Sequence, residues 1–185
     1  MALFSHWRKS RQRQQSADGY VASLLREPDE ADVTWLAKVA TRGDDDHARW
    51  ELRYARRAIG QMVAQRDALD DRTASIVAAA LTAAFQADRN IDPARFALVE
   101  RQFNARVAAY RDALGARSAD GVVRLGQTLL AFSGGSFRDI DDTVKRAGAI
   151  MGGFEREANE SLRAAFGMAA LPEHVPPSAA AGTPK

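Results

Sequence analysis

The chain has 185 residues, of which 46% are hydrophobic and 27% charged, a balance that is ordinary for one globular domain with a substantial core. It contains no cysteine, which excludes disulfides, thiolate metal sites and cysteine nucleophiles. The formal net charge of +2 provides no global basic field, so we do not expect nucleic acid as the main partner.

The sequence shows no sign of membrane insertion or export. No stretch approaches the roughly 20 apolar residues needed to span a bilayer, and the N-terminus lacks the apolar segment of a secretory signal. Its basic residues are mostly arginine, a preference that codon usage in a GC-rich bacterial genome produces. We therefore expect a bacterial, cytoplasmic protein, with peripheral attachment to the inner face of the membrane as an alternative.

Residues 1–17 form a basic N-terminal arm that contains no acidic residue. The composition favours a partly disordered tail. In the alternative interpretation, apolar residues of the arm enter a membrane surface or a partner groove while its cations meet anionic headgroups. The residues that would make these contacts are Leu3, Phe4, Trp7, Arg8 and Lys9. Binding of nucleic acid by this arm is a further alternative, for which no specific motif is present.

Two short helices are predicted next, over about residues 18–26 and 30–41. Pro28 separates them, and Asp29 is a candidate N-cap of the second. Gly43 should end this second helix just before the central helix of the chain.

The central helix is predicted over residues 44–66, where three consecutive aspartates provide favourable acids at its start. One side of this helix is an apolar stripe that consists of Ala48, Leu52, Ala55, Ile59, Met62 and Val63. At about 100° per residue, Trp50 and Tyr54 lie on a different side from this stripe. We therefore expect the helix to contact neighbouring helices, or a partner, on two sides.

Arg49, Arg53 and Arg57 form a ladder of like charges on this helix, beside Trp50 and Tyr54. In one interpretation the arginines are solvated or pair with acids of neighbouring helices. In the other they receive an acidic partner, a phosphate or a lipid headgroup, and the two aromatic rings provide an apolar anchor. The second interpretation makes these five side chains the predicted partner-binding residues.

The common nucleotide-binding and metalloprotease motifs are absent. His47 and Glu51 have the i, i+4 spacing that could hold one divalent ion if Asp139, Asp141 and Asp142 supplied further carboxylates. The Glu-x-x-His repeats of di-iron bundles are missing, and the three aspartates also suit a helix start. We therefore expect no cofactor and keep a metal site at His47 and Glu51 as an alternative.

The second half of the chain begins with a helix over residues 70–88 that is apolar or small on nearly all sides. This pattern predicts an element buried among others, so we expect it at the centre of the fold together with the 44–66 helix. Asp92 and Pro93 then form a strong start signal for a helix that Gly115 ends.

The chain continues with a helix over residues 118–132 and a long final helix over residues 137–165. Gly148 and Gly152 lie four residues apart in the final helix, where they would allow another helix to approach closely or would mark a bend. Residues 168–185 are rich in proline and alanine, and we expect them to form a disordered tail.

Residues 103–114, FNARVAAYRDAL, resemble a short helix of the ubiquinol–cytochrome c chaperone family of membrane-complex assembly factors. The resemblance covers 12 residues, and the other motifs of that family are absent from this chain. It therefore assigns the chain to no family.

These patterns predict an all-α fold, a compact array of about six or seven helices in one domain over residues 18–167, with disordered terminal tails. We expect a non-enzymatic interaction protein, an accessory or assembly subunit that docks a larger complex through a protein partner or a second copy of itself. The alternatives are a metal-binding bundle or enzyme that uses His47 and Glu51, and a nucleic-acid binder that uses the N-terminal arm.

Overall fold

The computed structural model describes residues 2–68, 71–115, 120–135 and 141–167, with side chains described from residue 10 onward. Within this part, the chain forms seven α-helices, one 3-10 helix and no strand. The elements are α1 (Ala2–Leu24), α2 (Glu30–Val39), α3 (Asp45–Asp67), α4 (Asp71–Ala87), η1 (Pro93–Arg95), α5 (Phe96–Gly115), α6 (Gly121–Phe132) and α7 (Asp142–Phe166). The predicted all-α fold is therefore confirmed.

Four of the helical segments, α2, α3, η1 and α7, start at aspartate N-caps. Asp29, Asp44 and Asp92 each accept a hydrogen bond from a backbone N–H two or three residues further on, at 2.7, 2.9 and 2.9 Å. Asp141 does the same at the start of α7, where it accepts from the N–H of Val144 at 2.9 Å. Each cap satisfies a donor that the first turn of a helix leaves unpaired, so the helix boundaries follow from local sequence.

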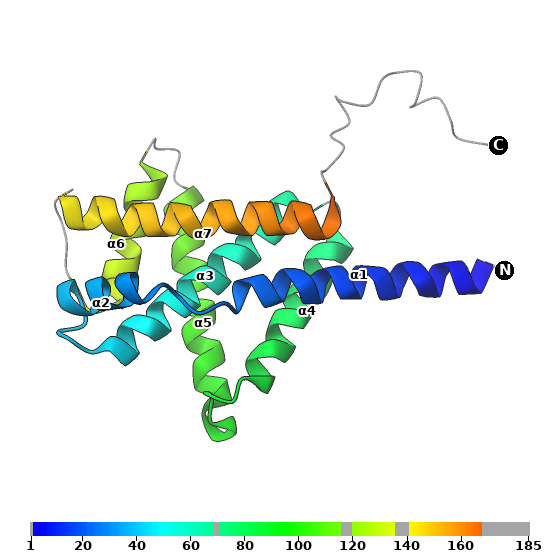
Figure 1. The fold of residues 1–185 in the computed structure, drawn as a ribbon, viewed down its shortest axis with the longest axis horizontal. Coiled ribbons are helices and arrows are strands. Elements are labelled where there is room, and N and C mark those ends of the chain that lie inside the picture. Colours follow the sequence, from blue (N-terminus) through cyan, green and yellow to red (C-terminus); the bar gives the residue numbers. More distant parts are fainter. Residues whose placement is uncertain (1, 69–70, 116–119, 136–140, 168–185) are drawn as a thin grey trace, which may run out of the picture.

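Helix α3 lies at the centre of the molecule and contacts all six other α-helices (Figure 1). Leu52 and Ile59 of its apolar stripe are buried, and so is Tyr54 on another side. The expectation that this helix has neighbours on two sides is therefore confirmed. Its central position means that every candidate residue of α3 is shaped by side chains from other helices.

Helix α4 is not the second central helix that its composition predicts. Only one stripe of α4 is buried, formed by Thr73, Val77, Leu81 and Phe85, whereas most of its remaining residues are half-buried or exposed. These four residues recur every fourth position and pack toward α1 and α3. Alanine exposes so little apolar surface that an alanine-rich face can remain in water, and the prediction failed for this reason.

Helix α1 is continuous from Ala2 to Leu24, so the helix predicted from Asp18 begins much earlier. Residues 2–17, which the composition predicted as a partly disordered basic arm, are therefore the first part of this helix. Ala17, at the end of that segment, is already fully buried. The N-terminal half of α1 extends past the ends of the other helices (Figure 1). Within the described residues, no helix combines the length and the apolar character needed to cross a membrane.

Helices α6 and α7 cross at a pair of glycines. A Cβ atom added to Gly126 would lie 2.6 Å from the backbone N of Gly148 and 2.6 Å from the carbonyl oxygen of Val144. A Cβ added to Gly152 would meet only the guanidinium of Arg156, at 3.7 Å. The close helix approach therefore depends on Gly126 and Gly148, not on the Gly148 and Gly152 pair that the spacing indicated.

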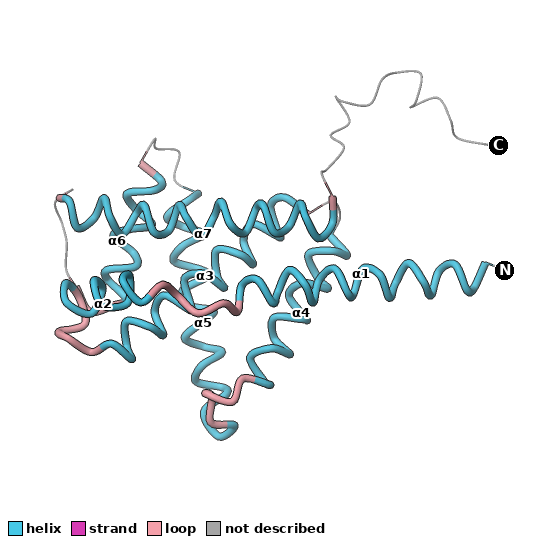
Figure 2. The backbone as a smooth tube through the Cα atoms, viewed as in Figure 1, coloured by secondary structure: helices cyan, strands magenta, loops and turns pink. Residues whose placement is uncertain are grey.

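The loop before η1, pink in Figure 2, connects α4 to α5 at one tip of the molecule. The two helices diverge from this tip. The first part of the predicted final helix, residues 137–140, lies outside the described residues. The predicted C-terminal tail, residues 168–185, also lies outside them.

Candidate functional site

The N-terminal half of α3 contains the five predicted partner-binding residues and also His47 and Glu51, the predicted alternative metal ligands. Arg49 donates hydrogen bonds to both carboxylate oxygens of Glu30 at the start of α2, the longer at 2.9 Å. Arg53 binds both oxygens of Glu27 between α1 and α2, with Nε 3.0 Å from Oε2. These charges are thus neutralised within the chain, which is the first of the two interpretations of the ladder.

Arg57 and Tyr54 are buried. The Arg57 Nη2 atom lies 3.3 Å from Oδ2 of Asp88, and its guanidinium carbon lies 4.8 Å from the centre of the Phe85 ring. The Tyr54 hydroxyl donates to the side-chain oxygen of Gln102 at 3.2 Å. Burial lowers the pKa of Arg57 and raises the pKa of Tyr54. Arg57 is therefore not available to a partner, whereas Tyr54 is available only where it lines the groove described below.

Trp50 remains partly accessible. The centre of its ring lies 5.7 Å from the centre of the Tyr54 ring. The guanidinium carbon of Arg53 lies 4.8 Å from the centre of the Trp50 ring. These contacts hold the indole against α3, and the residue is neither buried nor fully exposed. Trp50 can therefore provide a rigid apolar edge to whatever approaches this side of the helix.

Glu51 and Arg106 form an ion pair beneath this edge, with side chains that are 3% and 10% exposed. Arg106 Nε donates to Glu51 Oε2 at 2.8 Å and Nη2 donates to Oε1. Its Nη1 donates to the backbone carbonyl of Gln102 at 2.9 Å. The guanidinium carbon also lies 4.7 Å from the Tyr54 ring centre and 4.5 Å from that of Phe132. Both carboxylate oxygens and the arginine are thus fixed in place.

His47 lies beside this ion pair, with Nε2 3.5 Å from Oε1 of Glu51. A metal ion at these two residues would have to displace Arg106 from the carboxylate and would face its positive charge. Among the described residues, no group of three or more histidine, aspartate or glutamate side chains could hold a metal ion. The geometry therefore gives no support to the metal alternative.

Two of the three aspartates considered as further metal ligands lie in the described part of the chain and have other contacts. Asp141 is the N-cap of α7, and Asp142 accepts a hydrogen bond from Lys145 Nζ at 3.1 Å. Asp139 lies outside the described residues.

Arg106 is the central residue that the sequence analysis missed. The pattern contained a signal, since Arg106 lies three residues after Phe103 and four before Tyr110 and therefore on the buried face of α5. A charged residue on a core face requires a buried partner of opposite charge. Nothing in the sequence indicated that this partner would be Glu51.

A groove of about 400 Å³ opens over the ion pair, between α3 and the segment that includes η1 and the first turns of α5. Trp50, Leu98 and Val99 supply its apolar lining, and Arg95 lies at its edge. Leu98 is 45% exposed. Among the described residues, the one other large hydrophobic side chain that is similarly exposed is Val122 on α6, at 50%. The groove thus combines accessible apolar surface with a rigid polar floor.

Tyr110 lies in the core near the ion pair and is fully buried. Its ring packs edge-on against Phe132 at 6.1 Å between centres. Burial raises the pKa of its hydroxyl, and the nearby Glu51 carboxylate raises it further. The phenol therefore stays protonated and is screened from any substrate in the groove.

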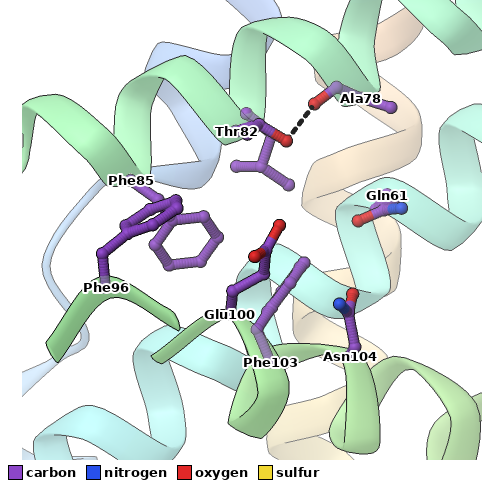
Figure 3. A pocket seen from close by; sticks show the side chains of 9 residues that line it. Gln61, Ala78, Thr82, Phe85, Phe96, Glu100, Phe103 and Asn104 are labelled. Carbon is purple, nitrogen blue, oxygen red and sulfur yellow. Dashed lines mark hydrogen bonds between the residues drawn. The ribbon is translucent and has the colours of Figure 1, made fainter. Parts of the chain in front are cut away.

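A smaller pocket lies on another side of α5, between α4 and α5 (Figure 3). Phe85, Phe96 and Phe103 surround it with the side chain of Glu100, and Thr82 donates its hydroxyl to the carbonyl oxygen of Ala78. Its volume of about 70 Å³ is below the roughly 300–1,000 Å³ typical of small-molecule sites. The groove over Glu51 and Arg106 is therefore the better candidate.

No protein-family model, curated protein or solved structure matches this chain. The resemblance of residues 103–114 to the ubiquinol–cytochrome c chaperone family is accordingly not extended by any wider match.

Proposed function

We propose that this protein is a non-enzymatic helical interaction protein, an accessory or assembly subunit that receives a segment of a partner protein in the groove between α3 and α5. One observation carries the proposal. Two ionisable side chains of this groove, Glu51 and Arg106, are bound to each other, whereas Trp50 and Leu98 present accessible apolar surface. Aromatic anchors beside accessible apolar surface are typical of protein interfaces.

The groove also indicates which partner chemistry suits it. An apolar side chain would gain most by packing against Trp50 and Leu98. Arg95 at the edge is 77% exposed along its side chain, and its contact with Asp92 Oδ2 spans 4.0 Å. An acidic residue of the partner could pair with Arg95 and would add specificity more than affinity.

Site-specific crosslinking tests this proposal. A photoreactive phenylalanine analogue is placed at Leu98 in the groove, or at Val122 on α6 as the matched exposed control. The chain is then irradiated in the cells that naturally produce it. We expect one discrete adduct from position 98, weakened at least about tenfold by Trp50→Ala, which removes the aromatic anchor. Position 122 should not give this adduct.

The Trp50→Ala variant must retain its helical circular dichroism for this comparison to hold. Arg53→Glu is less suitable as a companion change, because it would place two acids together at Glu27 and disturb the contact with the α1–α2 connection. Equal adducts at positions 98 and 122, or an adduct at 98 that survives Trp50→Ala undiminished, would reject the groove as the docking site.

Attachment to an anionic membrane surface is a second candidate, favoured by the basic N-terminal half of α1 that extends beyond the other helices (Figure 1). Such attachment would place the protein peripherally at the inner face of the membrane. Deletion of residues 2–10, which include Arg8 and Lys9, should abolish flotation with vesicles containing phosphatidylserine. Equal flotation of the full-length and shortened chains would remove this candidate.

A further inference from the structure

A second cavity of about 400 Å³ lies away from the groove, between the C-terminal halves of α3 and α5 and the middle of α7. Its apolar lining comes from Ile59, Met62 and Val63 of α3 and from Leu114 of α5. Both its volume and its position between bundled helices are typical of small-molecule sites. Unlike the 70 Å³ pocket of Figure 3, it is large enough for an alkyl chain.

The polar residues of this cavity gather at its rim. Arg66 donates to Glu155 Oε1 at 2.9 Å and to Asp67 Oδ2 at 2.8 Å, so its charge is neutralised. The hydrogen bond to Asp67 is the main reason why the pKa of Arg66 is raised. These contacts leave Arg66 with little capacity to bind a ligand.

Arg111 is different. Its side chain is exposed at the rim of the cavity. Its Nη2 atom donates a hydrogen bond to the side-chain oxygen of Gln65 at 2.9 Å. That acceptor is a neutral amide, so the described contacts place no carboxylate on this guanidinium. An apolar cavity with one cation of this kind at its rim is complementary to an anion that carries an alkyl chain.

We propose that this cavity binds a single-chain carboxylate amphiphile, a medium-chain fatty acid, with its carboxylate on Arg111 and its alkyl chain against Ile59, Met62 and Leu114. The flexible thioether of Met62 can adapt to the chain, and Leu114 is only partly buried. Each methylene buried should tighten binding about threefold to fourfold until the cavity is full.

Methyl NMR tests the site directly. The chain is labelled at methionine methyl groups, and Met62 in the cavity is compared with Met151, which is fully buried in α7 and does not line it. Titration with hexanoate, octanoate and decanoate, each kept below its micelle concentration, should shift the Met62 signal saturably. The affinity should rise with chain length while Met151 stays nearly unchanged.

The role of Arg111 is tested with ligands of equal length and different charge. Arg111→Gln should weaken decanoate binding about threefold to tenfold and leave decanol binding unchanged, because only the carboxylate uses the guanidinium. Arg101→Gln, an exposed site on the same helix outside the cavity, is the matched control and should change neither. Decyltrimethylammonium should bind more weakly than decanoate.

Three results would overturn the proposal. One is a Met62 signal that does not shift at any chain length, and another is equal shifts of Met62 and Met151 that indicate nonspecific association. The third is an Arg111→Gln effect of the same size on decanoate and decanol, which would show that the arginine does not bind the carboxylate. None of these measurements involves the partner groove, so the docking proposal is judged separately.

Discussion

Replacing Glu51 alone should destabilise the protein far more than replacing Glu51 and Arg106 together. The two side chains are 3% and 10% exposed. They lie 55 positions apart in the sequence, and the Arg106 guanidinium binds both carboxylate oxygens of Glu51. In Glu51→Leu, the Arg106 guanidinium loses both carboxylate acceptors and keeps the backbone carbonyl of Gln102. A buried charge without its counter-ion is one of the few single changes that cost several kcal/mol.

The expected cost of Glu51→Leu is about 3–5 kcal/mol, the range for removal of one member of a buried ion pair. In a domain of this size, each kcal/mol lowers Tm by about 2–4 °C, so Tm should fall by roughly 6–20 °C. Arg106→Met should cost a similar amount, because it leaves the Glu51 carboxylate buried and unpaired. The double variant Glu51→Leu/Arg106→Met leaves neither charge of this pair unpaired and should be at least about 2 kcal/mol more stable than either single variant.

Equilibrium urea unfolding of the wild type, both single variants and the double variant measures these differences as a thermodynamic cycle. Glu30→Gln is the control, since it breaks the exposed contact with Arg49 and should hardly change the unfolding midpoint. Additive single-variant effects, with a double variant less stable than both, would refute the idea that Glu51 and Arg106 are energetically coupled.

Further predictions concern the helix crossing and the surface charges. Gly126→Ala should destabilise by about 2 kcal/mol or more in urea unfolding, because its methyl group would collide with the backbone of Gly148; no loss of stability would contradict the close approach. Gly153→Ala in the same helix pair meets nothing within 4 Å and should stabilise by about 0.5–1 kcal/mol in the same measurement. The hydrogen bond from Arg49 lowers the pKa of Glu30 below its ordinary value of 4.5. The contact therefore stabilises the fold above that pH and is lost as the pH falls through the lowered pKa. Carboxyl NMR should show the pKa of Glu30 returning toward 4.5 in Arg49→Gln, and an unchanged titration would contradict the pairing.

Much of the secondary structure could be predicted from the sequence because its signals are local. The aspartate caps at positions 29, 44 and 92 accept hydrogen bonds from N–H groups two or three residues away. The few residues around each position are therefore enough to predict that a helix starts there. The two-sided character of α3 was equally readable, because Trp50 and Tyr54 lie off its apolar stripe in any helix of this sequence.

The candidate site could be predicted only in part. His47, Trp50 and Glu51 were identified as notable residues of α3, and all three line the groove. Leu98 and Arg106 of α5 were not, because their importance depends on α5 lying beside α3. Tyr54 and Arg57 were assigned to a partner surface, whereas the tertiary structure buries both and leaves only Tyr54 in the lining of the groove.

The sequence by itself thus determined where helices begin and which faces are apolar, since both depend on contacts within one or two turns. The tertiary structure decided which charges meet and that α4 does not join α3 at the centre. Glu51 and Arg106 come together only because α3 packs on α5, and α4 buries only the stripe that carries Val77, Leu81 and Phe85. The alanines on its other sides gain too little from burial to bring the helix into the centre. These outcomes depend on the packing of whole helices, which no local pattern encodes.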